Sequence, residues 1–466
     1  MAVSGTATPT APAAADQDAN RSAIAAWHEA LTPELALESW EWLTGQLERR
    51  GLFFGVRPLC TVLRPRFLTP AAYDLLRTRI GLLLHAFDTA LRAALADPAV
   101  LDQFRLDESE RALALEEPRI PASPVSRMDA FFDTADGRLR VTEYNAETPA
   151  GSAYSDALAE LFLAIPAARG FLRTHAMRPL PARPHVLHAL LGAWHQWSGR
   201  RDLPVIGILD WSDVPTRSEF VLFQDYFARL GLRAVIADVR DCALIAGRLF
   251  AAGDPVDLIY KRVLISELLD RCGMDHPVVR AVRTGAVCMA NPFRCKILHQ
   301  KASLAVLSDE RNAGLFGAAE REAIADHVPW TRVVEERKTI AGGETIDLVP
   351  WIERHRERLV LKPNDEYGGA GIVLGWEVDD AAWSAALRTA LAEPFIVQER
   401  IGLPSESFPS VADGKLVYAD RIVDTAPFVF GGAYVDGCLT RVSTAALVNV
   451  TAGGGSTVPT FVVERR

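Results

Sequence analysis

The chain has 466 residues, with 50 Lys and Arg against 59 Asp and Glu, which gives a formal net charge of −9. Hydrophobic residues make up 49% and charged residues 23%, a composition that excludes global disorder and predicts a large packed core. A chain of this length accommodates about three domains. Because the chain is acidic and has no long basic run, we expect no nucleic-acid partner.

Three features of the sequence bear on its location. Residues 1–18 are rich in Ala, Thr and Pro and lack the basic and apolar segments of a secretory signal, so we expect a disordered leader. The longest uncharged stretch, 442–463, contains Gly, Ser, Thr and Pro residues that favour strands and a turn over a membrane span. The six scattered cysteines show no CxxC spacing, which favours reduced thiols. We therefore expect a cytoplasmic protein with no membrane partner.

Residues 19–120 have the pattern of helices. Apolar residues recur there at helical spacing, for example at Leu76, Ile80 and Leu83, and such stripes are expected to face a core. The Pro-rich segment 118–124 ends this region. The sequence therefore predicts an N-terminal helical region.

Strand patterns dominate the next two regions. Residues 121–170 begin with a hairpin pattern whose turn signal is Asp136-Gly137. From 171 to 289, apolar strands alternate with helices, which predicts a parallel, Rossmann-like layer. The expected strands are 204–210, 232–239 and 257–263, with a helix at about 218–230.

Residues 290–466 continue the mixed pattern. A helix is expected to carry Lys301, and an apolar strand at 359–363 leads into a glycine-rich segment. A helix at 379–391 then leads into a strand that ends in Gln398 and Glu399. The last part of the chain has the pattern of short strands and turns.

The predicted hairpin carries a candidate metal site. Glu143 and Asn145 are two positions apart on a strand, so both side chains point to the same face. Folding at the turn brings Asp129 opposite position 143 or its neighbour. Such a set of oxygens suits Mg²⁺ bound with nucleotide phosphates, and Arg127, on the same face, could bind an anion. The same spacing of polar residues is also expected for an exposed polar strand that binds no metal.

Two lysines are candidates for binding phosphate. Lys362 ends an apolar strand, and Gly368, Gly369 and Gly371 follow it, as in a flexible loop that covers phosphates. The alternative for these glycines is an ordinary turn, and no Walker-type P-loop motif is present. Lys301 is a second candidate for binding phosphate. The alternative is that Lys301 is an ordinary lysine on the solvent-exposed face of a helix.

Two further motifs lie in the C-terminal part. Gln398 and Glu399 end an apolar strand, which suits contacts with an adenine edge and a ribose. Arg441 lies in an apolar strand, where an unpaired charge is costly, so we expect it to have an anionic partner. Asn449 and the run 453–456 follow and could supply backbone donors.

In this order, the motifs resemble those of the circularly permuted ATP-grasp ligases, the group that includes the synthetase domain of glutathionylspermidine synthase. The resemblance extends from about Arg127 to the C-terminus. In ordinary ATP-grasp enzymes the metal carboxylates follow the ATP lysines, whereas here Glu143 precedes Lys301, as in a permuted chain. No Cys/His nucleophile region precedes the hairpin, so we expect no counterpart of the amidase domain of glutathionylspermidine synthase, and an extra polar segment (336–348) lies before Lys362.

The resemblance implies an α/β (α+β) architecture. It consists of a circularly permuted ATP-grasp fold, a Rossmann-like pre-ATP-grasp domain and an N-terminal helical extension. With the patterns above, it divides the chain into a disordered leader (1–18), a helical region (19–120), a metal-binding hairpin of the ATP-grasp unit (121–170), a Rossmann-like substrate domain (171–289) and the nucleotide-binding subdomains (290–466).

The resemblance also implies an activity, that of an ATP-dependent carboxylate–amine ligase acting through an acylphosphate. The cofactors would be ATP and Mg²⁺, and the substrates a small carboxylate and an amine, such as an amino acid, peptide or polyamine. The implied roles are metal binding by Asp129, Glu143 and Asn145, ATP binding by Lys301, Lys362, Gly368, Gly369, Gly371, Gln398 and Glu399, and catalysis by Arg127 and Arg441.

Alternatives remain open at this point. The same scaffold could serve a kinase-like phosphotransferase or a non-catalytic ATP-binding protein. Glu147 or water could take the proton of the amine. Arg262 and Glu219 could contact substrate, with an ordinary salt bridge as the alternative, and the pair His185 and His188 is more typical of surface or core histidines than of a metal site.

Overall fold

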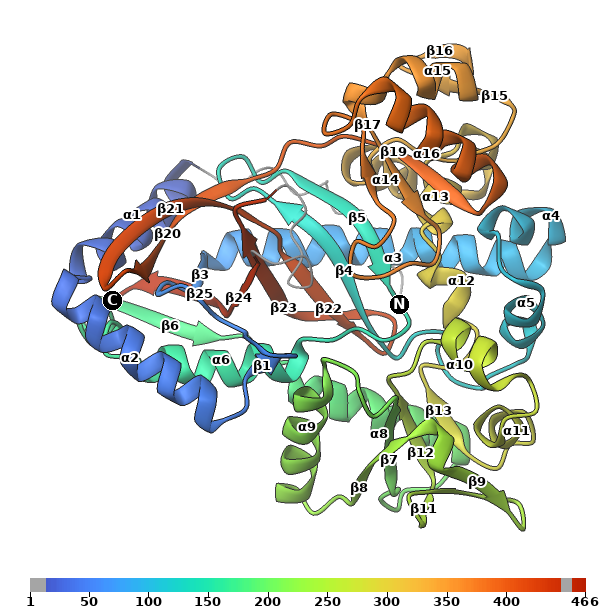
Figure 1. The fold of residues 1–466 in the computed structure, drawn as a ribbon, viewed down its shortest axis with the longest axis horizontal. Helices are drawn as coiled ribbons and strands as arrows, with labels where there is room; N and C mark the ends of the chain where they lie inside the picture. The colour runs from blue at the N-terminus through green and yellow to red at the C-terminus, as the bar shows by residue number, and fades with distance from the viewer. Residues whose placement is uncertain (1–13, 446–454) are drawn as a thin grey trace.

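The computed structural model describes residues 14–445 and 455–466, whose arrangement is shown in Figure 1. The N-terminal part is helical, as its apolar spacing predicts. The helices are α1 (Ala14–Ala30), α2 (Pro33–Arg49), α3 (Pro70–Ala96), α4 (Pro98–Leu101) and α5 (Glu108–Leu115). Because α1 begins at Ala14, residues 14–18 are helical and differ from the disordered leader expected there. Residues 1–13 lie outside the described part.

The largest sheet is antiparallel and joins strands from distant parts of the chain. The strand order is β20-β21-β23-β22-β4-β5, with β24 beside β23. These strands are β4 (Val125–Phe132), β5 (Leu139–Asn145), β20 (Ser405–Ala412), β21 (Lys415–Val423), β22 (Ala426–Phe430), β23 (Tyr434–Ser443) and β24 (Ser456–Val458). The predicted hairpin is thus β4–β5, and it continues into the C-terminal strands because β4 pairs with β22.

Helix α3 supports the hairpin from behind, as Figure 1 shows. Its apolar stripe, including Leu76, Ile80 and Leu83, shares one core with Met128 and Val141 of the hairpin. Burying these side chains on one face of the hairpin leaves the polar residues of the strands on the opposite face. The opposite face is the one that carries the candidate site.

A separate sheet of four parallel strands lies in the lower part of Figure 1. Its order is β13-β12-β7-β8, and every pairing is parallel. The elements are β7 (Ile206–Asp210), α9 (Arg217–Arg229), β8 (Ala234–Asp238), β12 (Leu258–Lys261), α10 (Ile265–Cys272), α11 (Pro277–Arg283), β13 (Cys288–Ala290) and, before them, α8 (Arg183–Ser198). The three predicted strands and the helix between the first two are confirmed. The additional strands β9 (Cys242–Ile245), β10 (Arg248–Ala251) and β11 (Asp254–Val256) form a small antiparallel sheet.

A third unit, at the upper right of Figure 1, is built on the sheet β14-β19-β17-β18. Its elements are β14 (Thr331–Val333), β15 (Lys338–Ala341), β16 (Glu344–Asp347), α15 (Leu348–Arg354), β17 (Leu359–Pro363), β18 (Val373–Leu374), α16 (Asp380–Ala392) and β19 (Phe395–Glu399). The extra polar segment contains the β15–β16 hairpin. Lys301 lies between α12 (Cys295–His299) and α13 (Ala302–Ser308), so two short helices replace the single predicted helix. Helix α14 (Ala318–His327) follows them.

The remaining elements close the molecule. Strand β25 (Thr460–Arg465) pairs with β3 (Arg66–Leu68) and β6 (His175–Pro179), and α6 (Ser152–Ala164) and α7 (Ala168–Phe171) lie before β6 in the chain. In the uncharged stretch 442–463 the described residues end β23 and form β24 and part of β25, whereas Asn449, Gly453 and Gly454 lie outside the described residues. Among the described helices, none combines the length and apolar character that a bilayer crossing requires. All six cysteines are free thiols.

Candidate functional site

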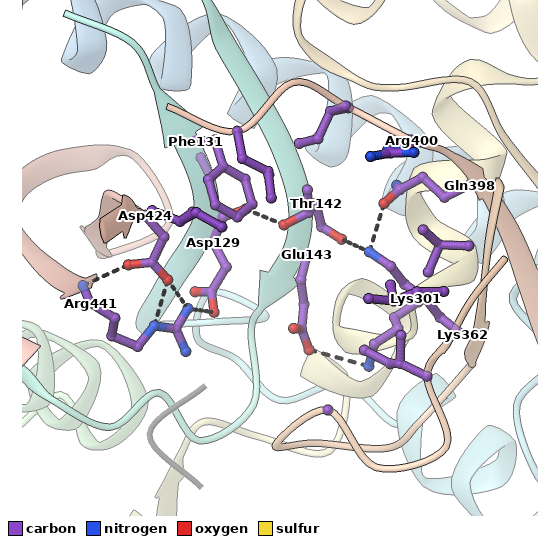
Figure 2. Close-up of a pocket in the computed structure, with 18 of the residues that line it drawn as sticks. Asp129, Phe131, Thr142, Glu143, Lys301, Lys362, Gln398, Arg400, Asp424 and Arg441 are labelled. Atoms are coloured by element: carbon purple, nitrogen blue, oxygen red, sulfur yellow. Dashed lines mark hydrogen bonds and ion pairs between the residues drawn. The ribbon is translucent and has the colours of Figure 1, made fainter. Parts of the chain in front are cut away.

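A cavity of about 660 Å³ lies between the β4–β5 hairpin and the β17–β19 sheet. Figure 2 shows Asp424 and Arg441 on one side, Lys362, Gln398 and Arg400 on the other, and Glu143 between them. The predicted site residues that line this cavity are Arg127, Asp129, Glu143, Asn145, Lys301, Lys362, Gly368, Gly369, Gln398, Glu399 and Arg441. Of the predicted set, only Gly371 is not in the lining.

The register of the hairpin brings the oxygen ligands together. Asp129 pairs directly with Glu143, and Arg127 pairs with Asn145, which confirms the expected opposition. The register shifts after Asp129, so that Ala130 pairs with Val141. Such a bulge re-aims side chains at the point where it occurs.

Asp129 lies at the centre of a chain of ionic contacts. Arg127 binds it through two nitrogens, Nε at 2.6 Å and Nη2 at 2.9 Å, and Arg441 Nη2 approaches the same carboxylate at 2.9 Å. Arg441 Nε also donates to Asp424 at 2.5 Å. Burial would raise the pKa of Asp129, but the two guanidinium groups outweigh it and lower the pKa to about 2. The anionic partner expected for Arg441 is therefore a pair of carboxylates, Asp129 and Asp424. The sequence analysis did not predict a role for Asp424.

Lys301 joins the hairpin to the glycine-rich segment. Its ammonium lies 3.3 Å from Glu143 Oε1 and also donates to the carbonyl of Glu366. The pKa of Glu143 is lowered, because Lys301 outweighs the effect of burial, which would raise it. Lys301 is almost fully buried, so it is not a solvated helix residue.

Lys362 is held at the far side of the cavity. Its ammonium donates to Gln398 Oε1 at 2.6 Å and to the carbonyl of Thr142 at 3.3 Å. Gln398 is in turn fixed by Thr331, which accepts from its amide nitrogen at 3.0 Å. Burial, assisted by the nearby Lys301, lowers the pKa of Lys362 to about 8. Gln398 is thus a partner of a lysine here, a role that its position at a strand end did not predict.

Apolar and aromatic side chains complete the cavity near Lys362. Arg400 stacks on Trp376, with its guanidinium carbon 4.1 Å from the ring centroid. This portion of the lining suits a ligand group that is flat and apolar. The other apolar residues of the lining are Ala130, Phe131, Val360, Ile372, Leu374, Ile401, Leu403 and Ile422.

The charges of the lining differ from those of the whole chain. Five basic residues line the cavity against four acidic ones, although the chain carries a net charge of −9. The basic residues are Arg127, Lys301, Lys362, Arg400 and Arg441, and the acidic ones are Asp129, Glu143, Glu399 and Asp424. In addition, Asn145 Oδ1 is buried and has no hydrogen-bond partner among residues 14–445 and 455–466. A buried oxygen of this kind needs a donor or a cation, so the lining suits an anion together with a metal ion.

Gly371 lies just outside the lining and has a structural constraint of its own. Its φ is +68°, and an added Cβ would come within 2.6 Å of Pro363 Cγ. Gly368 and Gly369 also have positive φ, at 65° and 79°. The backbone therefore favours glycine at these three positions, and residues 368–371 form turns, in which the amide of Ala370 donates to the carbonyl of Tyr367 at 3.2 Å.

Other residues considered from the sequence lie outside the cavity. Glu147 is buried between Lys261 at 3.1 Å and Lys296 at 3.2 Å, and these lysines hold its pKa far below the usual range in spite of burial. It is therefore poorly suited to take a proton from an amine. Arg262 and Glu219 form a buried ion pair at 3.5 Å, in which Glu219 also accepts from the amides of Gly151 and Ala153 at the start of α6.

Comparison with known proteins gives partial matches. No family model matches the chain. It is 24% identical to a putative glutamate–cysteine ligase of Frankia casuarinae over 86% of this chain and 46% of the relative, and 27% identical to another of Frankia alni over 43% and 23%. It is also 30% identical to an uncharacterized protein of Mycobacterium bovis over 30% of this chain and 28% of that protein. The chain spans less than half the length of these curated relatives.

One solved structure matches over nearly the whole chain. A glutathione synthetase-like effector from Globodera pallida superposes with a TM-score of 0.61, covering 93% of this chain and 98% of that one at 12% identity. At this identity the match shows a shared fold.

Proposed function

We propose that the protein is an ATP-dependent ligase that joins a carboxylate to an amine through an acylphosphate. One observation carries the proposal: a single cavity combines an oxygen cluster, a buried and a half-buried lysine, three arginines and a glycine-rich segment, brought together from three distant parts of the chain. The names of the relatives, which include glutamate–cysteine ligases, agree with this reaction class.

The proposed fold is a circularly permuted ATP-grasp with a Rossmann-like unit and an N-terminal helical extension. Two features support it. The hairpin with the carboxylates precedes the two lysines in sequence but pairs with β22, which follows them. The parallel sheet alternates strands and helices, as a Rossmann-like layer does. The domain boundaries given above are part of this proposal.

The lining fits a magnesium ion. Glu143 offers a carboxylate, and Asn145 offers an oxygen that has no hydrogen-bond partner in the described part of the chain. Asp129 completes the set, although two arginines already bind it. A divalent ion bound there would neutralise phosphate charge and orient the transferred group.

ATP would lie across the cavity. Lys301 and Lys362 would contact its phosphates as point charges, and the glycine-rich segment would cover them. The base would occupy the apolar portion near Trp376, with Glu399 and Gln398 at the strand end beside it. With a pKa of about 8, Lys362 is mostly charged at neutral pH, as phosphate binding requires.

The reaction would proceed in two displacements. A carboxylate oxygen attacks the γ-phosphorus, the bond to the bridging oxygen breaks, and ADP leaves. The amine nitrogen then attacks the acyl carbon, phosphate leaves, and the amine loses a proton to solvent. Arg127 and Arg441 would stabilise the transferred phosphoryl group, and exclusion of water would protect the acylphosphate. We further propose a small amino acid, peptide or polyamine as substrate, and a cytoplasmic location.

A product screen tests the proposal. The protein is incubated with Mg²⁺ and ATP together with pairs drawn from amino acids, short peptides and polyamines, and ADP, phosphate and new masses are measured. We expect ADP and phosphate in equal amounts and a product whose mass equals the two substrates less one water. A stable phosphorylated product would indicate a phosphotransferase instead, and the absence of ATP binding would contradict the proposal.

A further inference from the structure

A second group of charged side chains lies outside the cavity and is buried more deeply. Lys296 has a fully buried side chain and contacts three carboxylates: Asp365 at 2.6 Å, Glu147 at 3.2 Å and Glu110 at 3.2 Å. Glu147 also binds Lys261 at 3.1 Å. The three carboxylates come from separate parts of the chain, namely α5, the segment after β5 and the segment after β17. Lys296, on α12, therefore links regions that are far apart in sequence.

Three of the residues in this region, Glu147, His299 and Asp365, have the spacing of a metal site. The ammonium of Lys296 already binds two of them, the carboxylates of Glu147 and Asp365. Burial also lowers the pKa of His299. The ammonium of Lys296 thus takes the place that a metal ion would occupy between these carboxylates. We therefore interpret the group as a buried network of ion pairs, called the junction below, and not as a metal centre.

Asp365 is the member of this junction that belongs to the glycine-rich segment, which extends from residue 364 to residue 371. It follows directly on Asn364, whose side chain accepts from the amide of Ala302 at 2.8 Å and donates to the carbonyl of Phe104 at 2.9 Å. Asn364 therefore fixes the start of the segment to α13 and to the N-terminal region.

The next two residues are fixed as well. The carbonyl of Glu366 accepts from Lys301, and the hydroxyl of Tyr367 lies 3.4 Å from Glu267 on α10. After them come Gly368, Gly369 and Gly371 with positive φ. The segment thus has an anchored base at 364–367, which is followed by turns at 368–371 that contain these positive-φ glycines.

We propose that Lys296 is a positioning residue that, through Asp365, fixes the base of the glycine-rich segment over the nucleotide. The inference rests on the proposed function, because the segment matters only if it covers a phosphate. Within residues 364–367, Asp365 is the residue whose side chain forms an ion pair with the fully buried Lys296. Such a charged hydrogen bond is strong and directional. Without it, the cover over the acylphosphate loosens, and water reaches the intermediate before the amine does.

The test compares two carboxylate-to-amide substitutions. Asp365→Asn removes the contact but leaves Lys296 paired with Glu147 and Glu110, and the partly exposed position tolerates the change. Glu377→Gln is the matched control, because Glu377 is exposed, lies outside the cavity and forms no ion pair with any described residue. Asp365→Glu serves as the conservative variant.

Two quantities are measured on the full chain. Hydrogen exchange of the peptide covering 364–372 should become about tenfold faster in Asp365→Asn and stay within twofold in the control. The ratio of ADP formed to ligated product should rise at least threefold in Asp365→Asn, remain unchanged in Glu377→Gln and return toward the wild-type value in Asp365→Glu. A merely structural role would leave this ratio unchanged.

The two readouts separate the possible failures. Unchanged exchange in Asp365→Asn overturns the inference, and so does faster exchange with an unchanged product ratio. The exchange measurement needs no turnover. If no substrate pair supports turnover, the proposed function fails, and exchange alone still decides whether Lys296 fixes the segment.

Discussion

The molecule contains two charge clusters that lie close in sequence but differ in what they face. In the cavity, Glu143 and Asn145 are part of the lining, and the buried Asn145 Oδ1 has no hydrogen-bond partner among the residues that the structure describes. Around Lys296, by contrast, Glu147 is enclosed and bound by two lysines, although it is only two residues beyond Asn145. The first cluster can exchange its partners for a ligand, whereas the second cannot without unpairing a buried charge. Adjacent acidic residues thus separate into a binding role and a supporting role.

The largest expected effect tests the supporting role of Glu147. Glu147→Gln leaves two buried ammonium groups with one carboxylate fewer, and breaking a buried ion pair costs about 3–5 kcal/mol. We expect the free energy of unfolding in urea to fall by that amount. Glu117→Gln, at an exposed ion pair with Arg294, is the control and should change it by less than about 1 kcal/mol. Equal effects of the two substitutions would remove the distinction between the clusters.

Glu143→Gln tests the binding role. The substitution keeps the shape of the side chain but removes a carboxylate that the proposed metal site needs, so we expect ATP turnover to fall by about 10²–10³-fold. The melting temperature should change little, because Glu143 lines the cavity and its one ion pair within the described residues is with Lys301. Turnover near the wild-type level would contradict the site assignment.

Lys362→Met should weaken ATP binding by about tenfold to hundredfold, the range for a charged hydrogen bond to phosphate. Titration of Mg·ATP by calorimetry measures this directly, without any need for the second substrate. Lys338→Met, on the β15–β16 hairpin outside the cavity, is the matched control and should bind ATP as the wild type does.

The pH dependence follows from the same lysine. Its pKa is about 8 in the folded chain against 10.5 for the unperturbed group, so the folded protein loses this proton first. ATP affinity should therefore decline by up to about tenfold per pH unit above pH 8. Between pH 8 and 10.5 the unfolded chain binds more protons, and this residue makes the free energy of unfolding rise with pH. Neither dependence should remain in Lys362→Met.

Trp376→Ala should have the smallest effect. It removes the stacking with Arg400 and part of the apolar lining, which together contribute about 0.5–1 kcal/mol, or about a twofold to fivefold loss of ATP affinity. Comparison of ATP with inorganic triphosphate would sharpen the result, because only the nucleotide should respond. An equal loss for both ligands would place the base elsewhere.

The predictable part of the site is the part encoded by local pattern. The alternation of the hairpin and its Asp-Gly turn predict that Asp129 lies opposite Glu143, and the register agrees. Asp424 and Trp376 carry no such signal, because they reach the cavity only through pairing of distant strands and packing of separate units. Gln398 ends its strand at the expected position, but nothing in the local sequence reveals that Lys362 lies beside it.

The same limit applies to the fold. Strands and helices of the parallel layer follow from their periodicity, whereas the pairing of β4 with β22 joins segments that no local pattern connects. Lys301 was expected inside one helix, but the chain breaks there into α12 and α13, and its amide hydrogen-bonds to Asn364 instead. Contacts across the tertiary structure, rather than helix propensity, determine that break.

The pairing of β4 with β22 has a consequence for biosynthesis. Asp129 and Arg441 are 312 positions apart, so the first half of the site leaves the ribosome long before the second. Until β22 and β23 emerge, the hairpin presents an open strand edge and an incompletely paired Asp129. Closing so long a loop is slow, and a nascent chain should acquire the proposed nucleotide affinity only after β22 and β23 have emerged.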